Sequence, residues 1–141
     1  MATRPPGAAL VAAVALGLLA SCSSGAGAGG PTPEARAAFE AETGVHVVRV
    51  AITGGGGLVD LRYQVIDTDK AQHLQHVPPT LVDAGSGEII DTYLMDHAHS
   101  APPEAGHTYP LIFVNEQGLI ERGGEVAVVV GGTRLEQVAV E

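Results

Sequence analysis

A short run of potential metal ligands stands out in the chain, L-M-D-H-A-H-S from Leu94 to Ser100. Met95 is the one methionine besides the initiator, and His97 and His99 follow it two residues apart. Side chains at that spacing share one face of an extended segment. Thioether sulfur and imidazole nitrogen together suit copper, with methionine favouring Cu(I). The run therefore indicates a candidate copper site with Met95, His97 and His99 as ligands.

The best-placed fourth ligand is His107. Pro102 and Pro103 have fixed φ angles, which would lower the entropy cost of closing the loop that brings His107 back. Asp96 would point away from its neighbours in an extended chain and is a poor ligand. The segment is similar to the Met/His-rich loops of extracytoplasmic copper carriers, although no spacing carries over residue by residue.

A second interpretation of the same run involves no metal. Met95 would pack at the base of a loop, and the histidines would decorate a polar, acidic surface. The second methionine or cysteine that usually secures Cu(I) is missing, and short histidine motifs often occur without a metal. Five of the six histidines fall between residues 73 and 107, and His73 and His76 would share a face in one helical turn. Whether these rings converge decides between the two interpretations.

The N-terminal residues follow the pattern of a secretory leader. One positive charge at Arg4 precedes an apolar run from Ala8 to Ala20. That run has the length of a signal-peptide core and is shorter than the ~20 residues that span a bilayer. Gly/Ser-rich sequence follows it without basic stop-transfer residues. Residues 1–21 are therefore expected to be a signal peptide.

The apolar run ends in Leu19-Ala20-Ser21-Cys22, an aliphatic residue and two small residues before the single cysteine of the chain. This motif resembles the lipobox of bacterial lipoproteins. The resemblance implies cleavage before Cys22, a diacylglyceryl group on its sulfur and often a further acyl chain such as palmitate on its amine. Two or three acyl chains would hold the protein durably at the membrane. We expect an extracytoplasmic protein that is lipid-anchored to the cell membrane through Cys22.

Residues 22–33 then form the lipidated cysteine and a tether, S-S-G-A-G-A-G-G-P-T-P, which carries no charge. Such a composition is typical of a flexible linker. Loss of Arg4 with the leader leaves six basic residues against 16 acidic ones, a net charge of −10 with histidines neutral. A domain this acidic is a poor candidate for binding nucleic acid or anionic lipid headgroups. The charge favours solubility and self-repulsion, which fits a monomeric domain. The alternative is that the charge attracts cations or basic partners.

Residues 34–141 are expected to form one domain, which opens with a short helix. Thr32 is the expected N-cap, Pro33 takes the first helical position and Gly44 ends the helix. Phe39 is the large apolar residue that would dock it on the core.

The rest of the domain is predicted to consist of antiparallel strands. Alternation puts Val48, Val50 and Ile52 on one face of the run 45–53, and a glycine loop at 54–57 leads into the run 58–66. The second run alternates in the same way, with Leu61 among its core positions. Further strands are predicted around a turn at 83–87, at 109–115, and on both sides of Gly131-Gly132.

About seven strands of five to nine residues predict a mainly β fold, a single antiparallel β-sandwich with a short N-terminal helix. Its architecture resembles the immunoglobulin-like class. A β-barrel is the main alternative. A parallel α/β fold does not fit, because no helices alternate with the strands.

Few arrangements in the sequence are typical of a catalytic centre. Ser86 and Ser100 lie outside any Gly-x-Ser-x-Gly turn, and no His-Glu-x-x-His pattern occurs. Asp67 and Asp69 flank a turn at a strand end and lack the further oxygen ligands that calcium needs. The glycines at 54–57 lead into a strand without the Gly-Lys-Ser/Thr of a phosphate loop. We expect no enzymatic activity.

Two functions in different classes remain. The first is a non-enzymatic binding or accessory domain for another envelope component, which it would contact through an edge strand or the aliphatic, glycine-rich end of the sandwich. The alternative is a metal-handling lipoprotein that holds copper in the loop 95–107. No cofactor is expected for the first function, and copper is the cofactor of the second.

Overall fold

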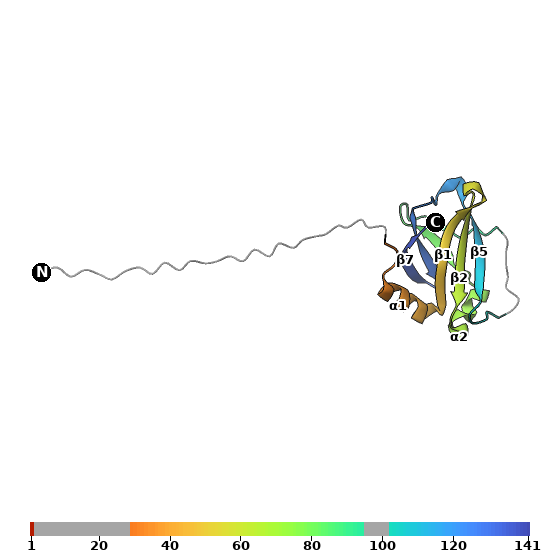
Figure 1. The fold of residues 1–141 in the computed structure, drawn as a ribbon, viewed down its shortest axis with the longest axis horizontal. Helices are drawn as coiled ribbons and strands as arrows, with labels where there is room; N and C mark the ends of the chain where they lie inside the picture. The colour runs from red at the N-terminus through yellow and green to blue at the C-terminus, as the bar shows by residue number, and fades with distance from the viewer. Residues whose placement is uncertain (2–28, 95–101) are drawn as a thin grey trace.

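The structure of the protein, a computed structural model, describes Met1, residues 29–94 and residues 102–141. These residues form the predicted β-sandwich, with seven strands in two antiparallel sheets (Figure 1). One sheet has the order β1-β2-β5 and the other the order β4-β3-β6-β7. The strands are β1 (Val45–Thr53), β2 (Leu58–Val65), β3 (Thr80–Asp83), β4 (Ile89–Ile90), β5 (Thr108–Val114), β6 (Glu125–Val130) and β7 (Thr133–Ala139). β3 and β4, with four and two residues, are shorter than expected.

The strand order is that of an immunoglobulin-like sandwich. That class places strands A, B and E in one sheet and strands C, F and G in the other, with C′ added beside C in some members. Here the first, second and fifth strands share one sheet, and the third, fourth, sixth and seventh strands share the other. β4 therefore takes the place of C′, and no strand D occurs in the part of the chain that the structure describes.

The core lies between the two sheets and consists of aliphatic and aromatic side chains at alternating positions. The buried hydrophobic positions in β2 are Val59, Leu61, Tyr63 and Val65, and those in β6 include Val126, Val128 and Val130. These are the faces that the alternation predicts. Removal of this apolar surface from water is the main stabilising contribution to such a fold.

β1 departs from strict alternation at one position. Its pairing with β2 shifts register between Val47 and Arg49, which makes Val48 the extra residue of a β-bulge. Val47 is buried, whereas Val48 is 48% exposed. The expectation that Val48 shares a face with Val50 and Ile52 is wrong, because the bulge reverses the alternation on its N-terminal side.

Helix α1 (Pro33–Thr43) packs against β1 and β7 (Figure 1). Thr32 accepts a hydrogen bond from the Ala35 N–H at 3.2 Å, and Gly44 ends the helix with a φ of 72°. Both ends agree with the predicted caps. Phe39 is 2% exposed and anchors the helix on the core.

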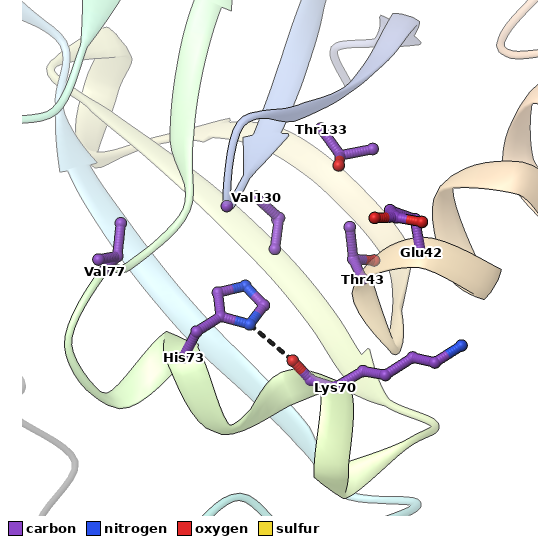
Figure 2. Close-up of a pocket in the computed structure, with 8 residues that line it drawn as sticks. Glu42, Thr43, Lys70, His73, Val77, Val130 and Thr133 are labelled. Atoms are coloured by element: carbon purple, nitrogen blue, oxygen red, sulfur yellow. Dashed lines mark hydrogen bonds between the residues drawn. The ribbon is translucent and has the colours of Figure 1, made fainter.

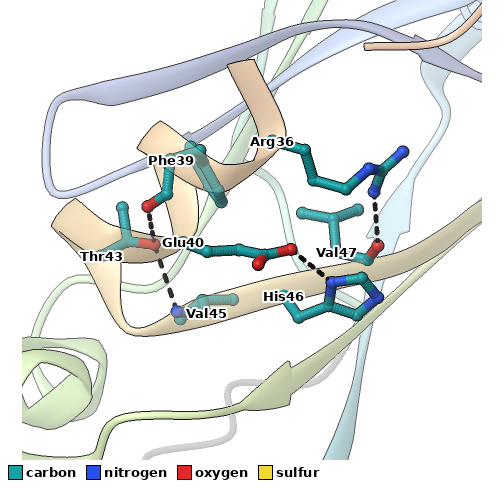
Figure 3. Close-up of polar contacts among 7 residues, drawn as sticks. All are labelled: Arg36, Phe39, Glu40, Thr43, Val45, His46 and Val47. Carbon is teal, nitrogen blue, oxygen red and sulfur yellow. Dashed lines mark hydrogen bonds and ion pairs between the residues drawn. The ribbon is translucent and has the colours of Figure 1, made fainter. Parts of the chain in front are cut away.

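Polar contacts fix the C-terminal half of α1 to the start of β1 (Figure 3). Glu40 Oε1 lies 2.6 Å from His46 Nδ1. The Thr43 hydroxyl donates to the Phe39 carbonyl oxygen at 2.7 Å and accepts from the Val45 N–H at 3.2 Å. The buried hydroxyl of Thr43 therefore joins the last turn of the helix to the first residue of the strand.

The C-terminus closes one open side of the sandwich. Val140 forms a parallel bridge with Val50 of β1. The Glu141 N–H donates to the Val50 carbonyl oxygen at 2.9 Å, and the Ile52 N–H donates to the Glu141 carbonyl oxygen at 2.8 Å. The chain thus passes from β7 in one sheet to the edge of β1 in the other.

The segment after β4 closes the opposite side. The Leu94 N–H donates to the Ile112 carbonyl oxygen at 2.9 Å, and Tyr93 forms an antiparallel bridge with Phe113 of β5. The rings of Tyr93 and Phe113 lie 5.2 Å apart between centroids. Among the described residues, both edges of the β1-β2-β5 sheet therefore have backbone pairing partners, which limits the addition of another strand there. The edges of the other sheet are β4 and β7, and α1 packs against β7.

Two short helices occupy the segment predicted as a strand end and turn. Asp67 is the N-cap of α2 (Thr68–Ala71), and its Oδ1 accepts from the N–H groups of Asp69 and Lys70 at 3.1 and 3.2 Å. The 3₁₀ helix η2 (Gln72–Gln75) follows directly. The other 3₁₀ turns are η1 (Gly54–Gly56) and η3 (Glu116–Gly118).

The described residues contain no helix with the length and apolar character needed to cross a membrane. Residues 2–28 lie outside the described residues, and Cys22 is among them. The signal peptide, the lipidation and the tether therefore remain predictions from the sequence.

Candidate functional site

Three of the four candidate metal ligands, Met95, His97 and His99, lie outside the described residues. The fourth, His107, precedes β5, and its Nδ1 lies 3.0 Å from Glu104 Oε2. Its side chain is 63% exposed. Among residues 29–94 and 102–141, no three His, Cys, Asp or Glu side chains come together as a metal site.

Aromatic rings connect His107 with the core. The ring centroids of His107 and Tyr109 are 6.4 Å apart, and Tyr109 stacks on Tyr63 at 5.8 Å. Burial, with a smaller contribution from Tyr109, raises the pKa of Tyr63 to about 12, because the phenolate loses hydration inside the sandwich. Tyr63 therefore stays neutral at physiological pH and adds no charge near His107.

A cleft of about 480 Å³ opens where α1 ends and α2 begins (Figure 2). Its volume falls in the range of small-molecule sites, roughly 300–1,000 Å³. Three elements build its walls: the end of α1, the segment from α2 to the start of β3, and the β6–β7 hairpin. The lining residues are Glu42, Thr43, Lys70, His73, Val77, Val130, Gly131 and Thr133.

Close backbone contacts hold these elements together. A Cβ at Gly44 would lie 2.5 Å from the Asp67 carbonyl oxygen, so glycine is needed for α2 to approach the end of α1. The Lys70 ammonium donates to the Ala41 carbonyl oxygen in the last turn of α1. That contact satisfies a helix-terminal acceptor and places a positive charge at the negative end of the helix dipole.

His73 is the most constrained polar residue of the cleft. Its Nδ1 lies 2.6 Å from the Lys70 carbonyl oxygen, which can only accept, so Nδ1 carries the proton. Its Nε2 is buried and has no hydrogen-bond partner in the described structure. A Cβ at Gly131 would lie 3.0 Å from that nitrogen. The imidazole is therefore held between Lys70 and the tip of the β6–β7 hairpin.

This arrangement favours binding over proton transfer. Nδ1 of His73 is already bonded, and Nε2 is covered by Gly131, so neither nitrogen is placed to exchange a proton with a bound molecule. The remaining lining combines the carboxylate of Glu42 and the hydroxyl of Thr133 with the methyl groups of Val77 and Val130. Such a mixed lining suits a compact group held by apolar contact and a few hydrogen bonds.

From the sequence, His73 was expected only to share a face with His76 in one helical turn. The cleft itself was missed, because its walls come from distant segments: Lys70 is 27 residues after Thr43, and Val130 is 53 residues after Val77. Two local signals were available. Asp67 is a helix-capping residue ahead of good helix formers, and Gly131-Gly132 marks a tight hairpin whose tip can approach another segment closely.

No family model, curated protein or solved structure matches the chain.

Proposed function

We propose that the protein is an extracytoplasmic lipoprotein, anchored to the cell membrane through Cys22, whose domain binds another envelope component without catalysis. The cleft between α1, α2 and the β6–β7 hairpin is the proposed binding surface. The anchor is supported by Leu19-Ala20-Ser21-Cys22, in which the only cysteine of the chain follows an aliphatic and two small residues.

The observation that carries the proposal is the position of the cleft relative to the tether. Pro31 precedes the first turn of α1, whereas Glu42 and Thr43 line the cleft at its last turn. Eleven helical residues at a rise of 1.5 Å separate these points by roughly 16 Å. A partner could therefore occupy the cleft without displacing the tether.

The closure of the sandwich also favours the cleft over an edge strand. Strand addition needs a row of unpaired N–H and C=O groups. Val140 and Glu141 pair with β1, and the segment from Thr92 to Leu94 pairs with β5. In the other sheet the long edge strand is β7, against which α1 packs, so we favour the end of the sandwich over strand addition.

Site-specific photocrosslinking in intact cells tests this function. A photoreactive residue at Val77, 55% exposed on the cleft rim, should yield one discrete adduct. The matched control is Ile89 on β4, which is 62% exposed and lies outside the cleft. Adducts at neither position, or equal adducts at both, would contradict a binding role for the cleft.

Copper handling is the second candidate function, and one contact favours it. The Nδ1 of His107 faces the Glu104 carboxylate at 3.0 Å, an arrangement that orients histidines toward metals in many sites. Titration of the protein with Cu(I) and Cu(II) by calorimetry, repeated on the double variant His97→Ala/His99→Ala, tests this candidate. Sub-micromolar binding that the double variant loses would support it, and binding that the double variant retains would exclude it.

A further inference from the structure

An arginine-rich surface lies where the chain enters the domain. Gly30 and Pro31 line a small groove together with Arg36, Val48 and Arg49. Arg36 is held there because its Nη1 donates to the Val47 carbonyl oxygen at 3.2 Å (Figure 3). We define the arginine face as Arg36, Val48, Arg49, Asp60 and Arg62.

A single buried carboxylate organises this face. Asp60 Oδ2 lies 3.1 Å from Arg49 Nη2 and 3.0 Å from Arg62 Nε. The Asp60 side chain is 8% exposed, whereas those of Arg49 and Arg62 are 40% and 47% exposed. The carboxylate therefore lies beneath two guanidinium groups whose outer parts reach the solvent.

The three groups leave positive charge at the surface. Asp60 offsets one of the two arginines, so the trio carries a net charge of +1. Each guanidinium uses one N–H on Asp60 and has others available for an external acceptor. A planar guanidinium binds phosphate oxygens in pairs, so two of them fixed side by side are organised for a phosphate group.

The surrounding composition sets this face apart from the rest of the domain. After Cys22 the chain has six basic residues against 16 acidic ones, and three of the six, Arg36, Arg49 and Arg62, lie here. Glu141 lines the same groove, and Glu40 faces His46. Val48 adds an exposed aliphatic group at the bulge. Exposed aliphatic and basic residues together are typical of protein surfaces that contact lipid headgroups.

The short tether keeps this face close to the lipid anchor. Gly30 is eight residue steps after Cys22, and eight steps of extended chain span at most about 28 Å. We propose that the arginine face rests on the headgroups of the membrane that holds Cys22, with Arg49 and Arg62 binding the phosphate of an anionic phospholipid. This inference rests on the proposed lipid anchor. It differs from the expectation based on the net charge of the domain, because charges more than about 8 Å apart are largely screened in physiological salt and the local charge then decides such a contact.

The test uses the mature protein in vesicles of phosphatidylcholine, with and without phosphatidylglycerol, that contain a gadolinium-labelled headgroup. Relaxation of the Val48 methyl groups should exceed that of the Ile89 methyl groups several-fold, and phosphatidylglycerol should increase the difference. Val48 and Ile89 are both exposed aliphatic residues, and they belong to different sheets. Equal relaxation at the two positions, or greater relaxation at Ile89, would overturn the proposal.

A triple variant, Arg49→Gln/Asp60→Asn/Arg62→Gln, removes the net charge of +1 and keeps polar groups that can hydrogen-bond. In the same experiment it should remove most of the extra Val48 relaxation that phosphatidylglycerol produces, because it removes one cationic charge near an anionic surface. The control Arg134→Gln removes one positive charge from an arginine of similar exposure, 46%, on β7. An equal loss in both variants would mean that only overall charge matters and would contradict the arginine face.

Two further measurements show whether the lipid contact or the lipid anchor is the part of the proposal that fails. Inorganic phosphate that shifts the Arg49 and Arg62 side-chain resonances, together with vesicles that leave Val48 unaffected, would assign the pair to free phosphate and exclude the lipid. Detergent partition of the same preparation reports on the anchor separately. An aqueous protein whose Val48 still responds to phosphatidylglycerol would disprove the anchor and support the face.

Discussion

Val50 of β1 and Val140 beside the C-terminus form a parallel bridge that joins the two sheets of the sandwich. Val50 and Val140 are 0% and 3% exposed, so the end of the chain is part of the core. The last two residues also exchange backbone hydrogen bonds with Val50, Ile52, Gly123 and Gly124. The C-terminus therefore contributes to stability more than chain ends usually do.

Deletion of Val140 and Glu141 should destabilise the domain by roughly 3–5 kcal/mol, because it removes a buried aliphatic side chain and several backbone hydrogen bonds. Urea unfolding followed by circular dichroism measures the change. Glu141→Ala is the control, since it keeps the backbone contacts and should change the free energy of unfolding by about 0.5 kcal/mol or less. A deletion as mild as this control would show that the bridge is unimportant.

Asn115 should stabilise the end of the sandwich that contains η1. Its Nδ2 donates to the carbonyl oxygens of Gly56 and Ile120, both at 2.8 Å, and its Oδ1 accepts from the Ile120 N–H at 2.9 Å. Asn115→Ala leaves these backbone groups without their partner and should cost about 2–4 kcal/mol. The exposed neighbour Glu116→Ala should be close to neutral in the same unfolding experiment. A neutral Asn115→Ala would show that water replaces the amide.

Alkaline pH should destabilise the fold through Tyr63. Its pKa is about 12 in the folded protein against a usual value of 10.0, so the folded state holds the proton that the unfolded state releases. The contribution to stability is complete below pH 10.0 and is lost as pH rises toward about 12. Burial also raises the pKa of Tyr93.

Ultraviolet titration of the three tyrosines checks this prediction. Tyr63→Phe should remove the latest-titrating component and flatten the fall of stability above pH 10.0. A Tyr63 that ionises together with free tyrosine would contradict its burial.

The contact between His73 and Gly131 should appear as energetic coupling. Gly131→Ala adds a Cβ 3.0 Å from His73 Nε2 at a φ of 58°. His73→Ala should relieve part of that cost, with a coupling energy of about 1 kcal/mol in a double-mutant cycle. A Cβ at Gly132 meets nothing within 4 Å, so Gly132→Ala should be additive with His73→Ala. Additivity at both glycines would mean that the hairpin does not press on the imidazole.

Local patterns predicted much of the fold and little of the cleft. Thr32 and Gly44 mark the ends of α1 because capping depends on neighbouring residues alone. Leu61 lies in the core because side chains alternate along β2. Alternation gave the wrong face for Val48, because a bulge depends on the pairing between two strands and not on the local sequence. His73 acquired its environment from Lys70 and Gly131, and the approach of a distant hairpin cannot be read from local spacing.

The proposed membrane anchor is tested most directly by detergent phase separation of the wild-type protein and Cys22→Ala expressed from the full chain. Cys22 is the only cysteine, so the substitution removes the one residue that can carry a diacylglyceryl group. We predict that the wild type enters the detergent phase with the mass of two or three acyl chains on Cys22, and that the variant lacks this mass and its leader remains uncleaved. A wild-type protein that stays in the aqueous phase with an unmodified Cys22 would contradict the account.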